Sequence, residues 1–236
     1  MNLIVSFSPE LYSYYAEENS IVIVVDIFRA TTSICTAFHN GASAVRTVAS
    51  IDEAMQYKEK GYLVAAERNV RKYDFADFGN SPFDFTPEKV TGKEIIFTTT
   101  NGTRAVEKAL NADEILIGAF SNISVITDYC SSKNKNVLIL CSGWNNRFCM
   151  EDTLFAGAMA EKLMKSGNFD KKSDAVLAAL ELWKIAKTDL RTYICTAEHY
   201  DRLKLNGLEN SVDYCITTDT APVLPKYSKI RQVFTL

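Results

Sequence analysis

The stretch that decides the fold is residues 21–26, which read Ile-Val-Ile-Val-Val-Asp. It is β-branched and apolar on both faces up to the final carboxylate, as expected for a central strand that helices cover on both sides. Outward from it, apolar runs of strand length alternate with segments of helical period. This alternation predicts an α/β fold with a mixed, largely parallel β-sheet layered by helices.

The same pattern continues along most of the chain. Further strands are expected at residues 3–7, 44–48, 62–66, 94–97, 114–117, 137–140 and 230–236, and helices at residues 32–40, 51–60, 102–110, 121–130, 151–165 and most of 172–202. Between residues 67 and 92, charges, aromatics and prolines replace the periodicity, so we expect a long ordered loop there. We expect a single domain of residues 1–236, with two lobes of about residues 1–120 and 121–236 around a cleft as an alternative division.

Composition excludes several classes of function. The 236 residues are 47% apolar and 23% charged, with a formal net charge of -3, so we expect no nucleic-acid partner. Apolar runs such as residues 21–25 are far too short to span a bilayer, so we expect no membrane partner. We also expect no signal peptide, because the first residues lack a basic leader and a long apolar segment. Six scattered cysteines without a CxxC pair indicate reduced thiols and a cytoplasmic location.

Polar side chains cluster where four predicted strands end. These segments are Asp26 with Arg29, Glu67 with Arg68, residues 98–104, and residues 141–143 followed by Glu151 and Asp152. Ligands of open α/β sheets bind at the carboxyl ends of strands, where the connecting loops meet. We therefore expect carboxylates and arginines from separate loops to form a site for a metal ion and an anion.

Residues 98–104, TTTNGTR, connect a predicted strand to a predicted helix. The turn offers free backbone N–H groups and hydroxyls at Thr99, Thr100, Asn101, Gly102 and Thr103. Such a turn binds an anion at the positive end of the helix, and Arg104 adds a guanidinium. The simpler alternative is that Thr100 or Asn101 only caps the helix. Nucleotide binding is not expected, because the lysine and the spacing of a P-loop are absent.

The acidic residues allow two interpretations each. Asp26 beside Arg29 suits a metal ligand next to an anion-binding group, or alternatively a buried ion pair. Glu151 and Asp152 open a predicted helix, where one can bind Mg²⁺ and the other a water, or where both only offset the helix dipole. A haloacid-dehalogenase mechanism is not expected, because Phe28 occupies the position of its second acid.

The stretch CSGWNNR, from Cys141 to Arg147, fits the C-x5-R loop of thiolate phosphatases. A low-pKa Cys141 would attack phosphorus while Arg147 binds its oxygens. Phe148 stands where a hydroxyl is expected, and a packed structural cysteine is the alternative. The two histidines, His39 and His199, are too few for a histidine-rich metal site; His39 is expected to be structural and His199 to be a candidate for the cleft.

Together these segments resemble the 2-phosphosulfolactate phosphatase family, known as ComB-like proteins. The matching stretches are VVDIFRATTSICTAFHNGA (24–42), AAER (65–68), FGNSPFDFT (78–86), TTTNGTRAV (98–106), SN (121–122), CSG (141–143) and ED (151–152). Their order covers about residues 20–165, with weaker similarity to residue 223. The chain departs from the family in NVRKYDFAD after Arg68, which lacks glycines, and in the bulky WNNRFCM at 144–150.

The resemblance implies a Mg²⁺-dependent phosphatase that converts 2-phospho-3-sulfolactate, in coenzyme M biosynthesis, or a related phosphorylated 2-hydroxy acid. We expect catalytic roles for Asp26, Arg29, Glu67 and Arg68, substrate binding by Asn80, Ser81 and the turn from Thr99 to Arg104, and metal binding by Asp26, Glu67, Glu151 and Asp152. The partner would be a small anionic phosphorylated substrate, and a homodimer is an open alternative. A phosphatase that uses Cys141 and Arg147, and a non-catalytic anion-binding protein, are the alternatives.

Overall fold

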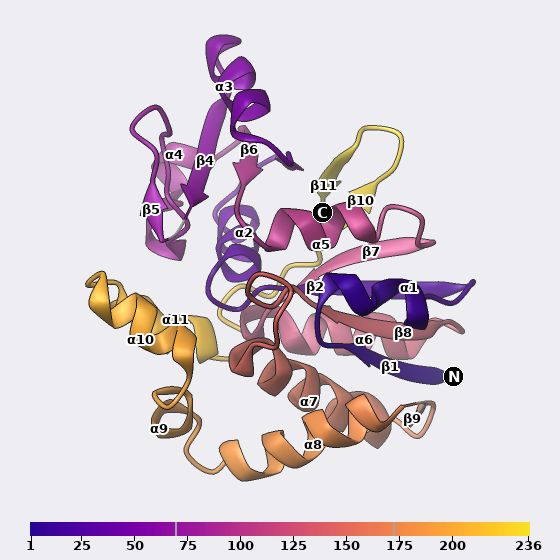
Figure 1. Cartoon of the computed structure of the whole chain (residues 1–236). Helices are drawn as coiled ribbons and strands as arrows, with labels where there is room; N and C mark the ends of the chain where they lie inside the picture. Colours follow the sequence, from indigo (N-terminus) through magenta and orange to yellow (C-terminus); the bar gives the residue numbers. More distant parts are fainter. Residues whose placement is uncertain (69, 172) are drawn as a thin grey trace.

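The computed structural model describes residues 1–68, 70–171 and 173–236. Its strands are β1 Asn2–Ser6, β2 Ser20–Val25, β3 Ala44–Thr47, β4 Leu63–Arg68, β5 Arg71–Lys72, β6 Glu94–Thr98, β7 Glu114–Gly118, β8 Asn136–Cys141, β9 Asp170–Lys171, β10 Lys226–Ser228 and β11 Val233–Thr235. They form one sheet in the order β5-β4-β6-β3-β11-β10-β7-β2-β8-β1-β9 (Figure 1). The expected α/β fold with a mixed, largely parallel sheet is confirmed.

Helices cover both faces of this sheet. They are α1 Tyr12–Tyr15, α2 Ala30–His39, α3 Ile51–Glu59, α4 Pro87–Val90, α5 Gly102–Lys108, α6 Ile123–Ser132, α7 Met150–Lys165, α8 Asp174–Ala186, α9 Leu190–Ile194, α10 Glu198–Leu205 and α11 Val212–Ile216. In Figure 1, α1 and α5 lie over the near face of β2, β7 and β8, and α6 and α7 lie over the far face. The described helices include none that is both long enough and apolar enough to cross a membrane.

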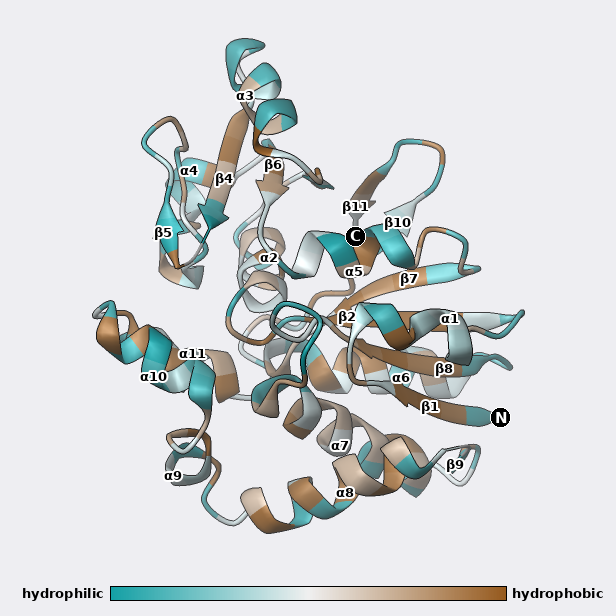
Figure 2. Ribbon diagram, viewed as in Figure 1, coloured by the Kyte–Doolittle hydropathy of each residue, from teal (hydrophilic) through white to brown (hydrophobic). Residues whose placement is uncertain are grey.

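Strand β2 lies at the centre of the layers. It pairs in parallel with β7 on one side and β8 on the other, and all six of its residues are buried. The Ile23 side chain lies on the face of the sheet where Phe155 of α7 packs. The Val24 side chain lies on the opposite face, near Val106 of α5. Each such side chain stabilises the fold by about 1.5–3 kcal/mol. Figure 2 shows the resulting brown, hydrophobic sheet centre between helices with teal outer faces.

Two parallel ladders are joined by an antiparallel hairpin near the end of the chain. One ladder contains β3, β4 and β6, and the other contains β1, β2, β7 and β8. The hairpin of β10 and β11 lies between them, pairing Lys226 with Leu116 and Phe234 with Val45. The sequence predicted one strand at residues 230–236, where β11 lies, but missed β10, which is equally short and has no apolar run in its sequence Lys-Tyr-Ser.

A charged cluster fixes this hairpin to the body. Glu114, at the start of β7, accepts hydrogen bonds from Lys226 of β10 and from Tyr129 of α6, the latter at 2.5 Å. Lys135 lies 2.8 Å from the same carboxylate. Partial burial alone would raise the pKa of Glu114, but the hydrogen bonds from Lys135, Lys226 and Tyr129 outweigh it and lower the pKa to about 2.

The region expected to be a long loop has more structure than predicted. Strand β4 continues through Arg68, β5 follows, and the prolines begin two short helices, η2 (Pro82–Asp84) and α4. Proline is favoured at the first helical position, because its missing N–H would have no partner there. The mostly helical segment at 172–202 is confirmed by α8 and α9 and the start of α10, while Lys172 lies outside the described residues.

Candidate active site

The ends of β2, β4, β6 and β8 meet at a small pocket. It is lined by Asp26, Phe28, Arg29, Glu67, Val70, Asn80, Thr99, Thr100, Asn101, Trp144, His199 and Leu203. These residues come from both parallel ladders and from α10, which closes the pocket from the far end of the chain. The pocket therefore brings together seven of the residues that the sequence proposed for catalysis or substrate binding.

Asp26 occupies the turn directly after β2. Its backbone N–H donates to Thr31 Oγ1 at 3.0 Å, and its carbonyl oxygen accepts from the Thr31 N–H, also at 3.0 Å. From the described residues, the carboxylate itself receives only a long hydrogen bond, 3.4 Å, from the Ala30 N–H. Burial raises the pKa of Asp26 to about 6, although His199 opposes this. A Cβ on Gly102 would lie 3.0 Å from Asp26 Oδ2, so glycine lets the turn approach this carboxylate.

Glu151 lies at the start of α7 and is 2% exposed. Its Oε1 is 2.5 Å from His199 Nδ1, which joins α7 to α10. Its Oε2 is buried and has no hydrogen-bond partner among the described residues. Burial alone would raise the pKa of Glu151, but the contact with His199 lowers it. Glu151 is thus an ionised, buried carboxylate with one free oxygen, which is the state a metal ligand needs.

Asp152 is bound differently from its neighbour. Its Oδ1 accepts from the Ile27 N–H at 2.9 Å and its Oδ2 from the Gly143 N–H at 3.0 Å. It therefore connects the turn after β2 to the loop after β8. Gly143 has φ +61°, and a Cβ there would come within 2.2 Å of Arg147 O, so this loop requires glycine. Burial, with Glu151 and Asp26 adding to it, raises the pKa of Asp152 well above its usual range.

Hydrogen-bond donors for an anion lie opposite these carboxylates. Arg29 is 3% exposed, and its Nη1 has no partner in the part of the chain that the structure describes. The Oγ1 atoms of Thr99 and Thr100 are also buried without partners among those residues. Burial lowers the pKa of Arg29, and neighbouring acids including Glu67 oppose that effect. Because buried polar groups normally have partners, this set is typical of a site that a ligand completes.

Glu67 and Arg68 are the last two residues of β4. Glu67 Oε1 accepts from the Val70 N–H at 2.8 Å, and its Oε2 accepts from Asn80 Nδ2 at 3.3 Å. The Arg68 guanidinium donates to the Glu67 carbonyl at 2.7 Å and to Thr98 Oγ1 at 2.8 Å. Glu67 thus lines the pocket with both oxygens engaged, whereas Arg68 contacts β4 and β6 and is not among the residues that line it.

Four residues expected to bind substrate are not among those that line the pocket: Ser81, Gly102, Thr103 and Arg104. Arg104 is exposed and lies 3.6 Å from Glu10, outside the residues that line the pocket, so its role in anion binding stays a prediction. It is the third residue of α5, where the helix has turned it toward solvent. Thr103 Oγ1 donates to the Thr99 carbonyl at 2.8 Å, which caps the turn. Ser81 precedes η2.

The structure contradicts the thiolate-phosphatase alternative. Cys141 is the last residue of β8, is wholly buried, and pairs with Val25 of β2. Burial, together with Asp152 and Glu151, raises the pKa of the Cys141 thiol well above its usual range. Arg147 is exposed, and its backbone exchanges two hydrogen bonds with Trp144, at 3.0 and 2.9 Å, so the loop forms a tight hairpin. A loop in this conformation does not surround the sulfur with donors, so Cys141 is a packed structural cysteine.

A second pocket adjoins the first through Trp144 and His199. It is lined by Trp144, Arg147, Phe148, Cys149, Met150, Glu151, Thr196, Ala197, Glu198, His199 and Arg202. The Arg202 guanidinium lies 4.2 Å from the centre of the Trp144 ring, and its Nη1 donates to Glu198 at 2.7 Å. Trp144 and Arg202 were not expected at the site. The spacing of His199, Arg202 and Leu203 on one helix face was the available signal.

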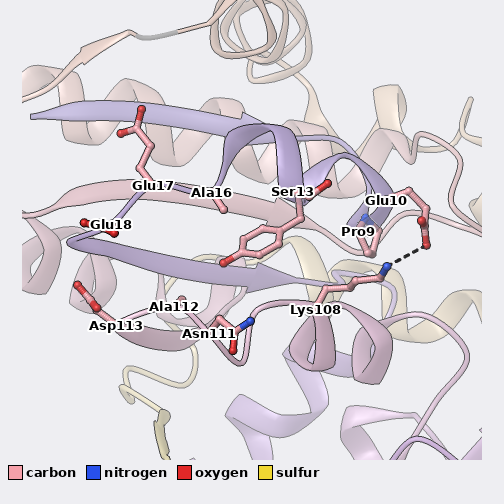
Figure 3. A pocket seen from close by; sticks show the side chains of 11 residues that line it. Pro9, Glu10, Ser13, Ala16, Glu17, Glu18, Lys108, Asn111, Ala112 and Asp113 are labelled. Atoms are coloured by element: carbon pink, nitrogen blue, oxygen red, sulfur yellow. Dashed lines mark ion pairs between the residues drawn. The ribbon is translucent and has the colours of Figure 1, made fainter.

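A wider surface pocket lies elsewhere, between α1 and the end of α5 (Figure 3). Lys108 and Glu10 form an ion pair at its edge, at 3.6 Å. Its other charged side chains, Glu17, Glu18 and Asp113, are acidic. An acidic rim of this kind does not favour a phosphorylated substrate. The pocket also shares no residue with the one around Asp26, so it is not part of the site.

Comparison with known proteins gives one consistent family. A family model described as 2-phosphosulpholactate phosphatase matches residues 6–229. A relative from Caldanaerobacter subterraneus subsp. tengcongensis, named probable 2-phosphosulfolactate phosphatase, is 38% identical over 209 residues, covering 87% of this chain and 86% of the relative. Relatives with the same name from Thermotoga maritima and Gloeobacter violaceus are 37% and 35% identical. They cover 86% and 96% of this chain, and 87% and 95% of their own lengths.

Proposed function

The chain belongs to the 2-phosphosulfolactate phosphatase family, and from that membership we propose that it hydrolyses 2-phospho-3-sulfolactate or a related phosphorylated 2-hydroxy acid. One observation supports the chemistry most strongly. The pocket places the buried carboxylate of Asp26 close to Arg29 Nη1 and to the hydroxyls of Thr99 and Thr100, three groups that have no hydrogen-bond partner among the described residues. Carboxylates opposite anion donors are what a metal-assisted phosphatase requires.

Mg²⁺ is part of this proposal, and the donor set fits it. Glu151 Oε2 is buried and unpartnered within the described residues, and Asp26 accepts only one long hydrogen bond. Both are hard oxygen donors of the kind that Mg²⁺ prefers, and water would complete its coordination. Asp152 and Glu67 have their oxygens engaged by backbone or side-chain donors, so we assign them to positioning the loops. A bound ion would polarise the phosphoryl oxygens and position the attacking water.

The remaining residues of the pocket bind and orient the substrate. Arg29 and the hydroxyls of Thr99 and Thr100 would hold the phosphoryl oxygens and stabilise the charge that develops on them. The contact between His199 and Glu151 fixes the direction of that carboxylate. Such donors are effective because they are held in a buried pocket, where water does not screen them.

The adjoining pocket suits the other end of the proposed substrate. A phosphorylated 2-hydroxy acid carries a carboxylate, and phosphosulfolactate also carries a sulfonate. The positive groups beside the site are Arg202, held against the Trp144 ring, and the exposed Arg147. We propose that Arg202 binds one of these anionic groups, because its planar fork of donors matches a carboxylate or sulfonate.

The experiment that tests this function measures phosphate release from a panel of phosphorylated 2-hydroxy acids, with MgCl₂ and with EDTA. The proposal expects turnover with Mg²⁺, loss of turnover with EDTA, and no loss with iodoacetamide. Activity that survives EDTA but not iodoacetamide would contradict it. If the chain only binds anions, phosphorylated acids will raise its melting temperature and release no phosphate.

A further inference from the structure

A cluster of mixed ligand atoms lies at the start of α7, on the side toward the second pocket. Cys149, Glu151 and His199 are all buried, and a sulfur, a carboxylate oxygen and a ring nitrogen from them lie within 4.8 Å of one another. We propose that these three side chains form a binding site for a thiophilic divalent ion such as Zn²⁺. This site shares Glu151 with the magnesium site proposed above, so the two ions would compete for that carboxylate.

The backbone holds these donors in place. Cys149 immediately precedes α7, and its carbonyl accepts from the Thr153 N–H at 3.3 Å and from Thr153 Oγ1 at 2.8 Å. Glu151 is the second residue of the same helix, and its Oε1 is 2.5 Å from His199 Nδ1 on α10. Its Oε2 is buried without a partner among the described residues. Two donors therefore come from one helix start and the third from a facing helix.

The separations suit a small tetrahedral ion. Zinc bonds of about 2.0–2.3 Å at tetrahedral angles place ligand atoms about 3.4 Å apart. The largest separation in the cluster is below 4.8 Å, so side-chain rotations are enough to close it. Three protein ligands leave one position open, and the cluster lines the second pocket, from which a water or a small ligand can occupy it.

Donor chemistry selects the class of ion. A thiolate and an imidazole are soft or borderline ligands that suit Zn²⁺ or Co²⁺, whereas Mg²⁺ takes oxygen ligands only. Burial and Glu151 raise the pKa of the free Cys149 thiol, so its proton would leave only as the ion binds. The resulting thiolate and the carboxylate would carry two negative charges, which a divalent ion neutralises. A thiophilic ion here would also withdraw Glu151 from Mg²⁺. Zinc bound at this site would thus inhibit magnesium binding in this chain.

Cobalt spectroscopy tests the site without relying on phosphatase activity. The full chain, stripped with EDTA and dialysed, is titrated with CoCl₂, and we expect a thiolate-to-cobalt charge-transfer band that saturates at one ion per chain. Cys149→Ser should abolish this band. Cys195→Ser should retain it, because this partly exposed cysteine lies outside the cluster. No band in the wild-type protein, or a band that persists in Cys149→Ser, would overturn the proposal.

A second variant covers the case in which the serine variant does not fold, which circular dichroism will show. His199→Gln keeps Cys149 in place and removes the nitrogen ligand. We expect it to weaken Co²⁺ binding at least tenfold, as loss of one of three protein ligands should. Unchanged affinity in His199→Gln would equally overturn the site. The cobalt titration does not depend on phosphatase activity. The metal site and the phosphatase function can therefore be refuted independently of each other.

Discussion

Replacing Asp26 with asparagine tests whether the buried, ionised Asp26 carboxylate destabilises the metal-free protein. Burial raises its pKa from 3.8 to about 6. The folded protein therefore binds more protons than the unfolded chain between about pH 4 and pH 6, and its free energy of unfolding falls as the pH rises through that range. Each unit of pKa difference between the folded and unfolded states corresponds to 1.36 kcal/mol. Above pH 6, the ionised Asp26 carboxylate therefore destabilises the metal-free protein by about 3 kcal/mol.

Asp26→Asn removes this charge and leaves the shape of the side chain. The asparagine amide is itself a buried polar group, and its burial offsets part of this effect. We therefore expect the free energy of unfolding of the variant to exceed that of the wild type by about 2 kcal/mol at pH 8 without metal. For a chain of this size, that corresponds to a melting temperature roughly 4–8 °C higher. At pH 4 the two proteins should differ by less than about 1 kcal/mol, because little of the carboxylate effect has yet developed. The variant should also lose at least about a hundredfold in kcat.

Urea unfolding followed by circular dichroism, in EDTA at pH 4 and pH 8, measures both differences. Asp128→Asn is the matched control, because Asp128 is exposed on α6, away from the pocket. It should change neither stability nor turnover. If Asp26→Asn is no more stable than the wild type at pH 8, or turns over at the wild-type rate, Asp26 is not an uncompensated ligand and the reasoning is refuted.

Four further outcomes are expected. Gly102→Ala should lower kcat about 10-fold or more with the fold retained, because its Cβ would press on Asp26 Oδ2 at 3.0 Å; wild-type kinetics would show that this approach is unimportant. Cys141→Ser should keep kcat within about threefold of the wild-type value, whereas a folded variant without activity would support the thiolate mechanism. Arg202→Ala should raise KM for phosphorylated 2-hydroxy acids but not for p-nitrophenyl phosphate, and equal effects on both would remove its role in specificity. Glu114→Gln should cost roughly 1 kcal/mol at pH 7, after allowance for solvent screening, and should flatten the stability loss between about pH 4.5 and 2; an unchanged acid limb would contradict the charged cluster.

The sequence located the strand ends that carry the site, but not the way in which they converge. Three antiparallel pairings separate β3 from β7, so the ladder with β4 and β6 runs opposite to the ladder with β2, and the carboxyl ends of the two ladders meet at the pocket around Asp26, Glu67 and Thr99. The sequence pattern locates those strand ends well, since long β-branched runs have few alternatives. It also identifies the buried acids at the start of α7, because carboxylates in a first helical turn are a distinct signal.

Side-chain direction was harder to predict. Arg104 follows the anion turn closely in sequence, yet each helical residue rotates by about 100°, so a position only a few residues along the helix faces solvent. Cys141 fits a phosphatase pattern in sequence, but strand alternation and the neighbouring β2 bury it. His199 comes from a helix more than forty residues after Glu151, and only tertiary packing brings the two together.

The central claim is that Asp26 and Glu151, which line two adjoining pockets, hold a divalent ion between them, and that Arg29 and Thr99 hold a phosphoryl group beside it. A crystal structure of the enzyme with MgCl₂ and inorganic phosphate measures this most directly. The account predicts an ion within about 2.1 Å of both carboxylates, the distance typical of magnesium, and a phosphate that contacts Arg29 and the Thr99 hydroxyl. An ion or phosphate bound elsewhere, with this pocket filled only by water at saturating ligand, would contradict it.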